Sequence, residues 1–140
     1  MHTKSFPGRY ESLAEIAEFV KELASAAGLS SFDIYAVETA VDEACSNIIE
    51  HGYQGEGIGE IYVSVEVMDS GLKIILHDHG RPFDPDAVPD PDLNASIEER
   101  ASHGLGLYFM RRLMDEVHFS FTTDRGNTLT LVKNKEKKTG

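Results

Sequence analysis

Apolar residues recur at helical spacing in two stretches near the start of the chain. Over residues 12–27 they follow an i, i+3, i+4, i+7 pattern, which predicts an amphipathic helix. A second helix is predicted from Ser30 or Ser31 to about His51, with Gly52 as its C-cap. The apolar stripe of this second helix consists of Ile34, Val37, Val41, Ala44 and Ile48. One face of each helix is therefore expected to pack against a common core.

The second half of the chain alternates apolar and more polar residues, which is typical of half-buried strands. Residues 60–78 contain two such runs joined by a glycine turn and predict a β-hairpin, and residues 118–133 predict another. Between the hairpins, residues 79–103 hold four of the five prolines, so we expect an irregular loop of the kind that often covers a ligand. Residues 103–117 follow it as a helix that opens on glycines.

The order of these elements is helix, helix, hairpin, long loop, helix, hairpin. That order predicts an α+β fold: a two-layer α/β sandwich with the helices on one face of a mainly antiparallel sheet. A chain of 140 residues fits a single domain, with a core over about residues 10–133 and a charged tail at 134–140. A further strand near the start, in the string HTKSF, is barely visible in the pattern.

The charge balance narrows the possible partners. The chain has 13 basic and 24 acidic residues, and its net charge of −11 repels nucleic acid. The short basic tail KNKEKKTG is typical of a solvated end. No stretch approaches the roughly 18 apolar residues of a membrane span, and no secretion signal is expected. The single cysteine, Cys45, cannot form an internal disulfide, so we expect a cytoplasmic protein.

A line of polar residues runs along the flank of the second helix. Glu43, Asn47 and His51 are spaced four apart, between the apolar stripe and the solvent-facing side. Such residues either belong to a solvated edge or form the wall of a polar pocket, and this helix alone does not decide between the two.

The second predicted strand ends in a second polar group. Asp78 is followed by His79 and Gly80, an arrangement that suits either a routine Asx turn or a carboxylate beside backbone that a ligand can approach closely. His77 and His79 fall on one face of the strand and Asp78 on the other, so we do not expect the three to share a metal ion.

A glycine-rich run opens the last helix. Gly104, Leu105, Gly106 and Leu107 would place free backbone N–H groups at a helix N-terminus, where phosphates bind. The run is short, and it lacks both the Gly-Lys-Ser/Thr of a P-loop and the third glycine of a dinucleotide-binding fold. By itself it is a weak signal.

Taken together and in this order, the features resemble the Bergerat ATP-binding fold that gyrase, histidine kinases and MutL share. The strings DEACSNIIEHGY, DHGRPFDP, GLGLYFMRRLMDEV and GNTLTLVK resemble, more specifically, the anti-sigma-factor serine kinases of bacterial partner-switching systems. The resemblance covers about residues 10–133. It implies a histidine-kinase-like ATPase domain that binds ATP and Mg²⁺.

The resemblance also implies a role for each matching residue. Asn47 would hold Mg²⁺ through its amide oxygen, and Glu43 would be the general base that takes a proton from the attacking hydroxyl. Asp78 would accept a hydrogen bond from the adenine amino group, with Gly80 leaving room for the ring. Thr128 would support that contact from the last strand.

The remaining roles concern the phosphates. The run from Gly104 to Leu107 would cradle them while residues 81–103 close over the site, and His51 falls on the position of a supporting histidine. The stretch from Glu99-Arg100 to Gly104 is a little longer than in the anti-sigma-factor kinases, which argues against assigning a phosphate contact to Arg100.

The implied activity is ATP-dependent phosphorylation of a serine or threonine on a small partner of the anti-anti-sigma type. A sigma factor or similar regulator would be a second partner, and family analogy suggests a homodimer. Two alternatives stay open: a non-catalytic module whose partner binding depends on ATP, and a stand-alone histidine-kinase-like ATPase domain. The presence of Glu43 favours catalysis, because a pocket that only binds has no need of a base.

Overall fold

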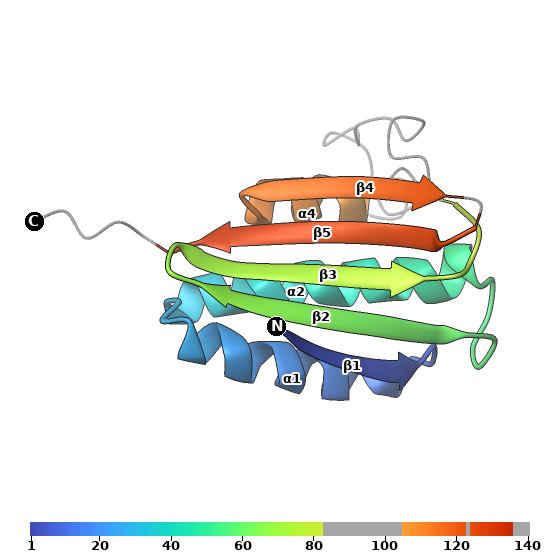
Figure 1. The fold of residues 1–140 in the computed structure, drawn as a ribbon, viewed down its shortest axis with the longest axis horizontal. Helices are drawn as coiled ribbons and strands as arrows, with labels where there is room; N and C mark the ends of the chain where they lie inside the picture. Colours follow the sequence, from blue (N-terminus) through green and yellow to red (C-terminus); the bar gives the residue numbers. More distant parts are fainter. Residues whose placement is uncertain (83–104, 123, 136–140) are drawn as a thin grey trace, which may run out of the picture.

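A computed structural model of the protein describes residues 1–82, 105–122 and 124–135 (Figure 1). In chain order the elements are β1 (His2–Pro7), α1 (Ser12–Ala26), α2 (Ser31–Asn47), the π-helical turn η1 (Ile48–Gly52), β2 (Glu60–Met68), β3 (Gly71–Asp78), α4 (Leu105–Leu113), β4 (Glu116–Thr122) and β5 (Gly126–Asn134). No helix in the described part of the chain is long and apolar enough to span a bilayer.

The strands form one five-stranded sheet in the order β1-β2-β3-β5-β4, and each neighbouring pair is antiparallel. The described α-helices α1, α2 and α4 lie against the same face of this sheet (Figure 1). The predicted α+β sandwich is therefore confirmed. The strand that was barely visible in the sequence is β1, which pairs with β2 along its whole length although Phe6 is its only buried residue.

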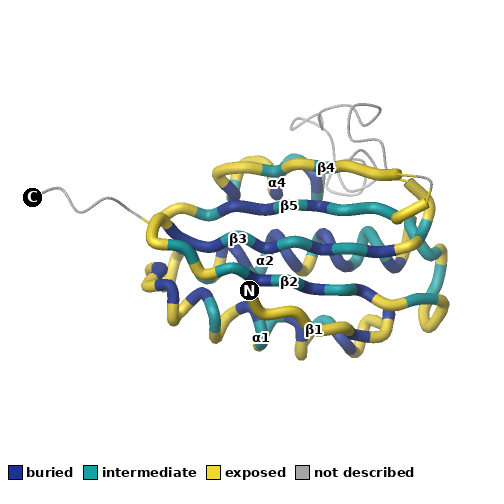
Figure 2. Tube along the Cα trace, in the orientation of Figure 1, coloured by how far each residue is buried: buried dark blue, intermediate teal, exposed yellow. Residues whose placement is uncertain are grey.

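The core fills the space between the helices and the sheet (Figure 2). The inward faces of β2, β3 and β5 supply alternate apolar residues, and burial of such side chains is the main force that holds the two layers together. The largest fully buried side chains of the core are Phe6, Ile61, Leu72, Ile74, Leu76 and Leu131 from the strands, and Ile16, Val20, Val37, Val41, Ile49 and Met110 from the helices.

Lys133, near the end of β5, joins the sheet to two helices. Its ammonium group donates a hydrogen bond to the carbonyl oxygen of Leu113 at the end of α4 (2.8 Å) and lies 3.8 Å from the buried carboxylate of Asp33 on α2. A cation at this position suits the C-terminal end of a helix, where carbonyl groups lack partners inside the helix. The contact fixes the relative positions of α2, α4 and β5.

Two helix boundaries differ from the sequence prediction. α2 ends at Asn47 and continues as η1, in which the amide of Tyr53 bonds to the carbonyl of Ile48, so the α-helix does not run to His51. Gly52 is not a left-handed cap, because the left-handed residue after the turn is Gln54 (φ 60°). α4 ends at Leu113 rather than at residue 117, because residues 116 and 117 already belong to β4.

Candidate functional site

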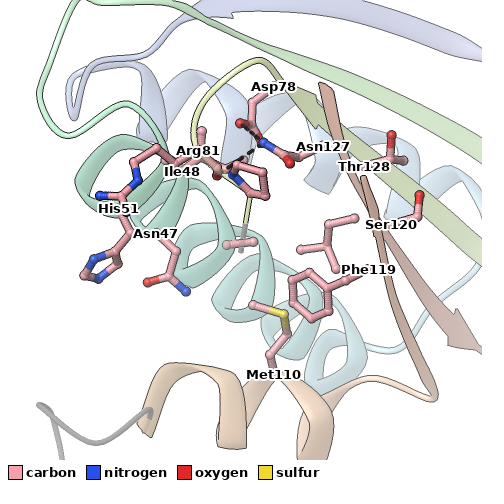
Figure 3. A pocket seen from close by; sticks show the side chains of 14 residues that line it. Asn47, Ile48, His51, Asp78, Arg81, Met110, Phe119, Ser120, Asn127 and Thr128 are labelled. Atoms are coloured by element: carbon pink, nitrogen blue, oxygen red, sulfur yellow. Dashed lines mark hydrogen bonds between the residues drawn. The ribbon is translucent and has the colours of Figure 1, made fainter. Parts of the chain in front are cut away.

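A pocket lies where η1, the end of β3, α4 and the β4–β5 hairpin meet (Figure 3). The segments that form it are far apart in the sequence, and the fold brings them together at one end of the sheet. Its walls are formed mainly by Asn47, Ile48, His51, Asp78, Arg81, Met110, Phe119, Asn127 and Leu129. The pocket therefore combines apolar side chains with several polar and charged groups that could orient a ligand, as small-molecule sites do.

Asp78 lies at one end of the pocket and is only 6% exposed. Its Oδ1 accepts hydrogen bonds from the backbone N–H of Gly80 (2.8 Å) and from the side-chain amide of Asn127 (3.0 Å). No described residue donates a hydrogen bond to its Oδ2. A buried carboxylate oxygen without a donor is costly, so Oδ2 is suited to a ligand that brings an N–H group.

Gly80 and Gly52 touch beside this carboxylate. A Cβ atom built on Gly80 would lie 2.5 Å from the carbonyl carbon of Gly52, so no larger residue fits at position 80 without a shift of the backbone. The carbonyl oxygen of Gly52 also accepts a hydrogen bond from the N–H of Arg81 (2.8 Å). A glycine at position 80 is therefore needed for the close backbone contact between η1 and the end of β3 beside Asp78. That Gly80 leaves room for the ring of a ligand stays a prediction.

Asn127 is a site residue that the sequence reasoning missed. Its amide nitrogen bonds to Asp78 and to the carbonyl oxygen of Gly80 (2.9 Å), whereas the sequence had indicated Thr128 for this support. Thr128 borders the pocket, but its hydroxyl lies 3.1 Å from Nδ1 of His77, on the other face of the sheet. Because alternate residues of β5 face the core, residue 127 points inward and residue 128 outward. Fixing the register of β5 could therefore have identified Asn127 from the sequence.

His77 and His79 do share one face, as predicted, with ring centroids 4.9 Å apart. No group of three or more metal-ligating side chains occurs among the described residues.

The polar line on the second helix reaches the pocket only in part. Asn47 and His51 line it, and in the described structure no hydrogen bond holds the side chain of Asn47 (Figure 3). Glu43 lies one turn before Asn47, with its carboxylate against the first turn of α4, where a Cβ on Gly106 would clash with Oε2. Burial raises the pKa of Glu43, and the nearby charges of Asp42 and Glu50 raise it further.

The glycine-rich run is described only from its second residue onward. Gly104 lies outside the described residues, as do the side chain of Leu105, Arg100 and the proposed lid from residue 83 onward. α4 begins at Leu105, and Gly106 meets Glu43. The side chain of Leu107 is buried, so this residue could offer a ligand only its backbone.

Comparison with known proteins identifies the family. The model of the histidine kinase-like ATPase domain matches residues 6–133. The chain belongs to the histidine kinase-like ATPase family. Within that family it is similar to the serine-protein kinases RsbW: 33% identical to that of Bacillus licheniformis and 31% to that of Bacillus cereus strain B4264, over 131 residues. Each alignment covers 91% of this chain and about 80% of the RsbW protein.

Solved structures agree on the fold of this ATPase domain. The catalytic domain of the histidine kinase ThkA superposes with a TM-score of 0.55 at 15% identity and covers 98% of this chain and 100% of that one. The histidine kinase domain of EL346 from Erythrobacter litoralis gives a TM-score of 0.52 at 17% identity, covering 90% of this chain and 60% of that one. The resemblance to anti-sigma-factor kinases and the Bergerat fold is thus confirmed.

Proposed function

We propose that the protein is an ATP-dependent serine/threonine kinase of the anti-sigma-factor type. Two lines support this: the relatives named serine-protein kinases, and the pocket that this chain builds at the end of β3. The observation that carries the proposal is the buried carboxylate of Asp78, which has one oxygen held by two donors and the other without a donor among the described residues.

In this proposal Asp78 selects adenine. Its Oδ2 accepts a hydrogen bond from the exocyclic amino group of adenine. Guanine has a carbonyl oxygen at the corresponding position, which would place two hydrogen-bond acceptors together. Gly52, which lines the pocket without a side chain and against which Gly80 packs, would leave room for the ring, and Ile48, Met110 and Phe119 would provide apolar contacts for its faces. Asn127 keeps the carboxylate in the required orientation.

The phosphates would lie toward α4. The amide oxygen of Asn47, which lines the pocket and has no hydrogen-bond partner among the described residues, is a suitable hard ligand for Mg²⁺, and His51 lies one turn further along. Backbone N–H groups of Gly104, Leu105, Gly106 and Leu107 are proposed to bind the phosphate oxygens. Bound Mg²⁺ would offset the negative charge of the nucleotide, which an acidic protein of net charge −11 requires.

Glu43 would act as the general base. It would accept the proton of a serine or threonine hydroxyl while that oxygen forms its bond to the γ-phosphorus and the bond to the ADP oxygen breaks. The raised pKa of Glu43 suits this task, because a stronger base takes a proton more readily near neutral pH. The substrate would be an anti-anti-sigma-type protein, with a sigma factor or similar regulator as a second partner and a homodimer as the assembly.

A second candidate is a module that binds its partners in an ATP-dependent way without phosphate transfer. One observation favours it: Glu43 lies against Gly106 and is not among the residues that line the pocket. Catalysis therefore requires the carboxylate to turn away from α4 when nucleotide binds.

Two measurements test these readings. Calorimetric titration with Mg-ATP and Mg-GTP should show binding of ATP and much weaker binding of GTP; no heat with ATP would reject both candidates. The protein is then incubated with ATP and an anti-anti-sigma-type protein, and the partner is analysed by mass spectrometry. Phosphoserine or phosphothreonine supports the kinase, whereas a stable ATP-dependent complex without phosphate supports the binding module.

A further inference from the structure

Arg81 is a charged residue in the pocket that neither the sequence pattern nor the family comparison singles out. It follows Gly80 in the segment after β3 and lines the pocket together with Asn47 and His51. Figure 3 shows its side chain extending away from Asp78, toward the part of the pocket where Asn47 and His51 lie. The residue thus reaches from the carboxylate end of the pocket toward the opposite end.

The backbone of Arg81 is held on both sides. Its N–H donates to the carbonyl oxygen of Gly52 (2.8 Å), and its own carbonyl oxygen lies 3.4 Å from the amide nitrogen of Asn127. The preceding Gly80 is packed against Gly52 so closely that a side chain there would clash. The Cα of Arg81 therefore has a fixed place relative to η1 and β5, which limits where its guanidinium can go.

The side chain has no anionic partner in the described part of the protein. The ion pairs found there involve His51, His118 and Lys133, and none involves Arg81. Among the described residues that line the pocket, Arg81 is the one with a permanent positive charge. In a chain with 24 acidic and 13 basic residues, a cation without an ion-pair partner at the edge of a ligand pocket points to an anionic ligand.

We propose that Arg81 binds a phosphate group of the nucleotide and makes the pocket selective for charged nucleotides over the nucleoside. This inference rests on the proposed ATP binding and adds a residue to it. Asp78 and Asn127 would read the base, and the guanidinium of Arg81 would read the phosphate charge by donating N–H groups to phosphate oxygens.

The test compares affinities of the full chain and three variants for ATP, ADP and adenosine, measured by calorimetry with adenosine in competition. Arg81→Ala should weaken ATP and ADP about tenfold, which corresponds to about 1.4 kcal/mol, and leave adenosine unchanged. Arg81→Lys should keep part of the affinity, since a charge remains without the planar fork. The effect of Arg81→Ala on ATP should shrink at high salt.

Arg9→Ala is the matched control. It removes the same charge from an exposed arginine that does not line the pocket, so its ATP affinity should equal that of the parent. Equal ATP affinity in Arg81→Ala and the parent would overturn the inference, as would an equal loss for adenosine, which would place Arg81 at the base. If the parent binds no ATP, the proposed function itself fails, and that result is distinct from both.

Discussion

The two ends of the pocket are built differently. At the Asp78 end, one carboxylate oxygen is held by two hydrogen bonds, Asn127 bonds on to the carbonyl of Gly80, and two glycines pack against each other. At the other end, no hydrogen bond within the described structure holds the side chain of Asn47 or of Glu43. The carboxylate at one end is held by hydrogen bonds without a ligand, whereas the polar groups at the other end have no such bonds from described residues.

We infer from this difference that the Asp78 end selects the nucleotide and that the helical end takes part in phosphate transfer. A preorganised acceptor loses little entropy when it binds, so the Asp78 end is suited to discriminate between bases. Under the proposed function, the helical end would accommodate phosphates, a cation and an incoming hydroxyl, and its polar groups would gain partners when these bind. We therefore expect substitutions at Asp78 and Asn127 to change which nucleotide binds, and substitutions at Glu43 to change what happens afterwards.

The substitution Glu43→Gln has the largest expected effect and distinguishes the two ends of the site most clearly. Glu43→Gln should lower phosphate transfer by about 10²–10⁴-fold, because an amide cannot accept the hydroxyl proton. ATP affinity should change by less than about threefold, since the residue does not line the pocket. Transfer is measured by phosphate incorporation into the partner and affinity by calorimetry. Unchanged transfer would remove Glu43 from the role of base.

Asp78→Asn should weaken base recognition at the Asp78 end of the pocket. The replacement places an NH₂ group where the adenine amino group also donates, so ATP affinity should fall about 100-fold. Asp69→Asn, in the exposed turn between β2 and β3, removes the same charge and should bind ATP like the parent. Full ATP affinity in Asp78→Asn would contradict base recognition by this carboxylate.

Asn127→Ala should have a smaller effect of the same kind. Asp78 would keep the hydrogen bond from Gly80 but lose its second donor, and we expect ATP affinity to fall about tenfold with a lower ATP-to-GTP ratio. Asn127→Asp would place two carboxylates about 3 Å apart, so its affinity should recover as the pH falls and one of them takes up a proton. An ATP-to-GTP ratio equal to that of the parent in Asn127→Ala would show that Asp78 needs no such support.

The smallest effect concerns the pH dependence of stability. Because burial raises the pKa of Glu43, the folded protein binds the proton of this carboxyl group more tightly than the unfolded chain does. The stability that this proton contributes is lost as the pH rises through the raised pKa. Glu43→Gln should therefore melt about 1–2 °C above the parent at pH 7–8, and the difference should vanish below the ordinary pKa of 4.5. Glu22→Gln, on the exposed side of α1, should show no such pH-dependent gain.

Most of the fold could be predicted because the apolar periodicity of the helices and strands matches their burial. β1 could not, because an edge strand with Phe6 as its only buried residue leaves almost no alternation to read. The change from α2 to η1 was also invisible, since residues 48–52 carry no proline and no sequence signal that separates i→i+5 from i→i+4 bonding.

The site could be predicted as far as its types of residue, less so in its details. Asp78 and Asn47 follow from motifs, and the fold brings both to one pocket. Thr128 lines the pocket, and its support of the adenine contact stays a prediction, whereas the hydrogen bond to Asp78 comes from Asn127 one position earlier. Sequence motifs alone do not reveal this second residue, because one residue of register exchanges the two faces of a strand. The sequence places Arg81 only at the start of the expected lid and gives it no role of its own, since its position depends on the contact between Gly80 and Gly52.

The strand order has a consequence for how the sheet assembles during folding. β5 is the last strand in sequence, yet it lies between β3 and β4 and carries the amide that steadies Asp78 as well as the lysine that ties α2 to α4. A nascent chain still lacking this segment would have exposed sheet edges on both sides of the gap and no finished cavity. The proposed nucleotide pocket would thus be complete only after β5 has paired with both β3 and β4.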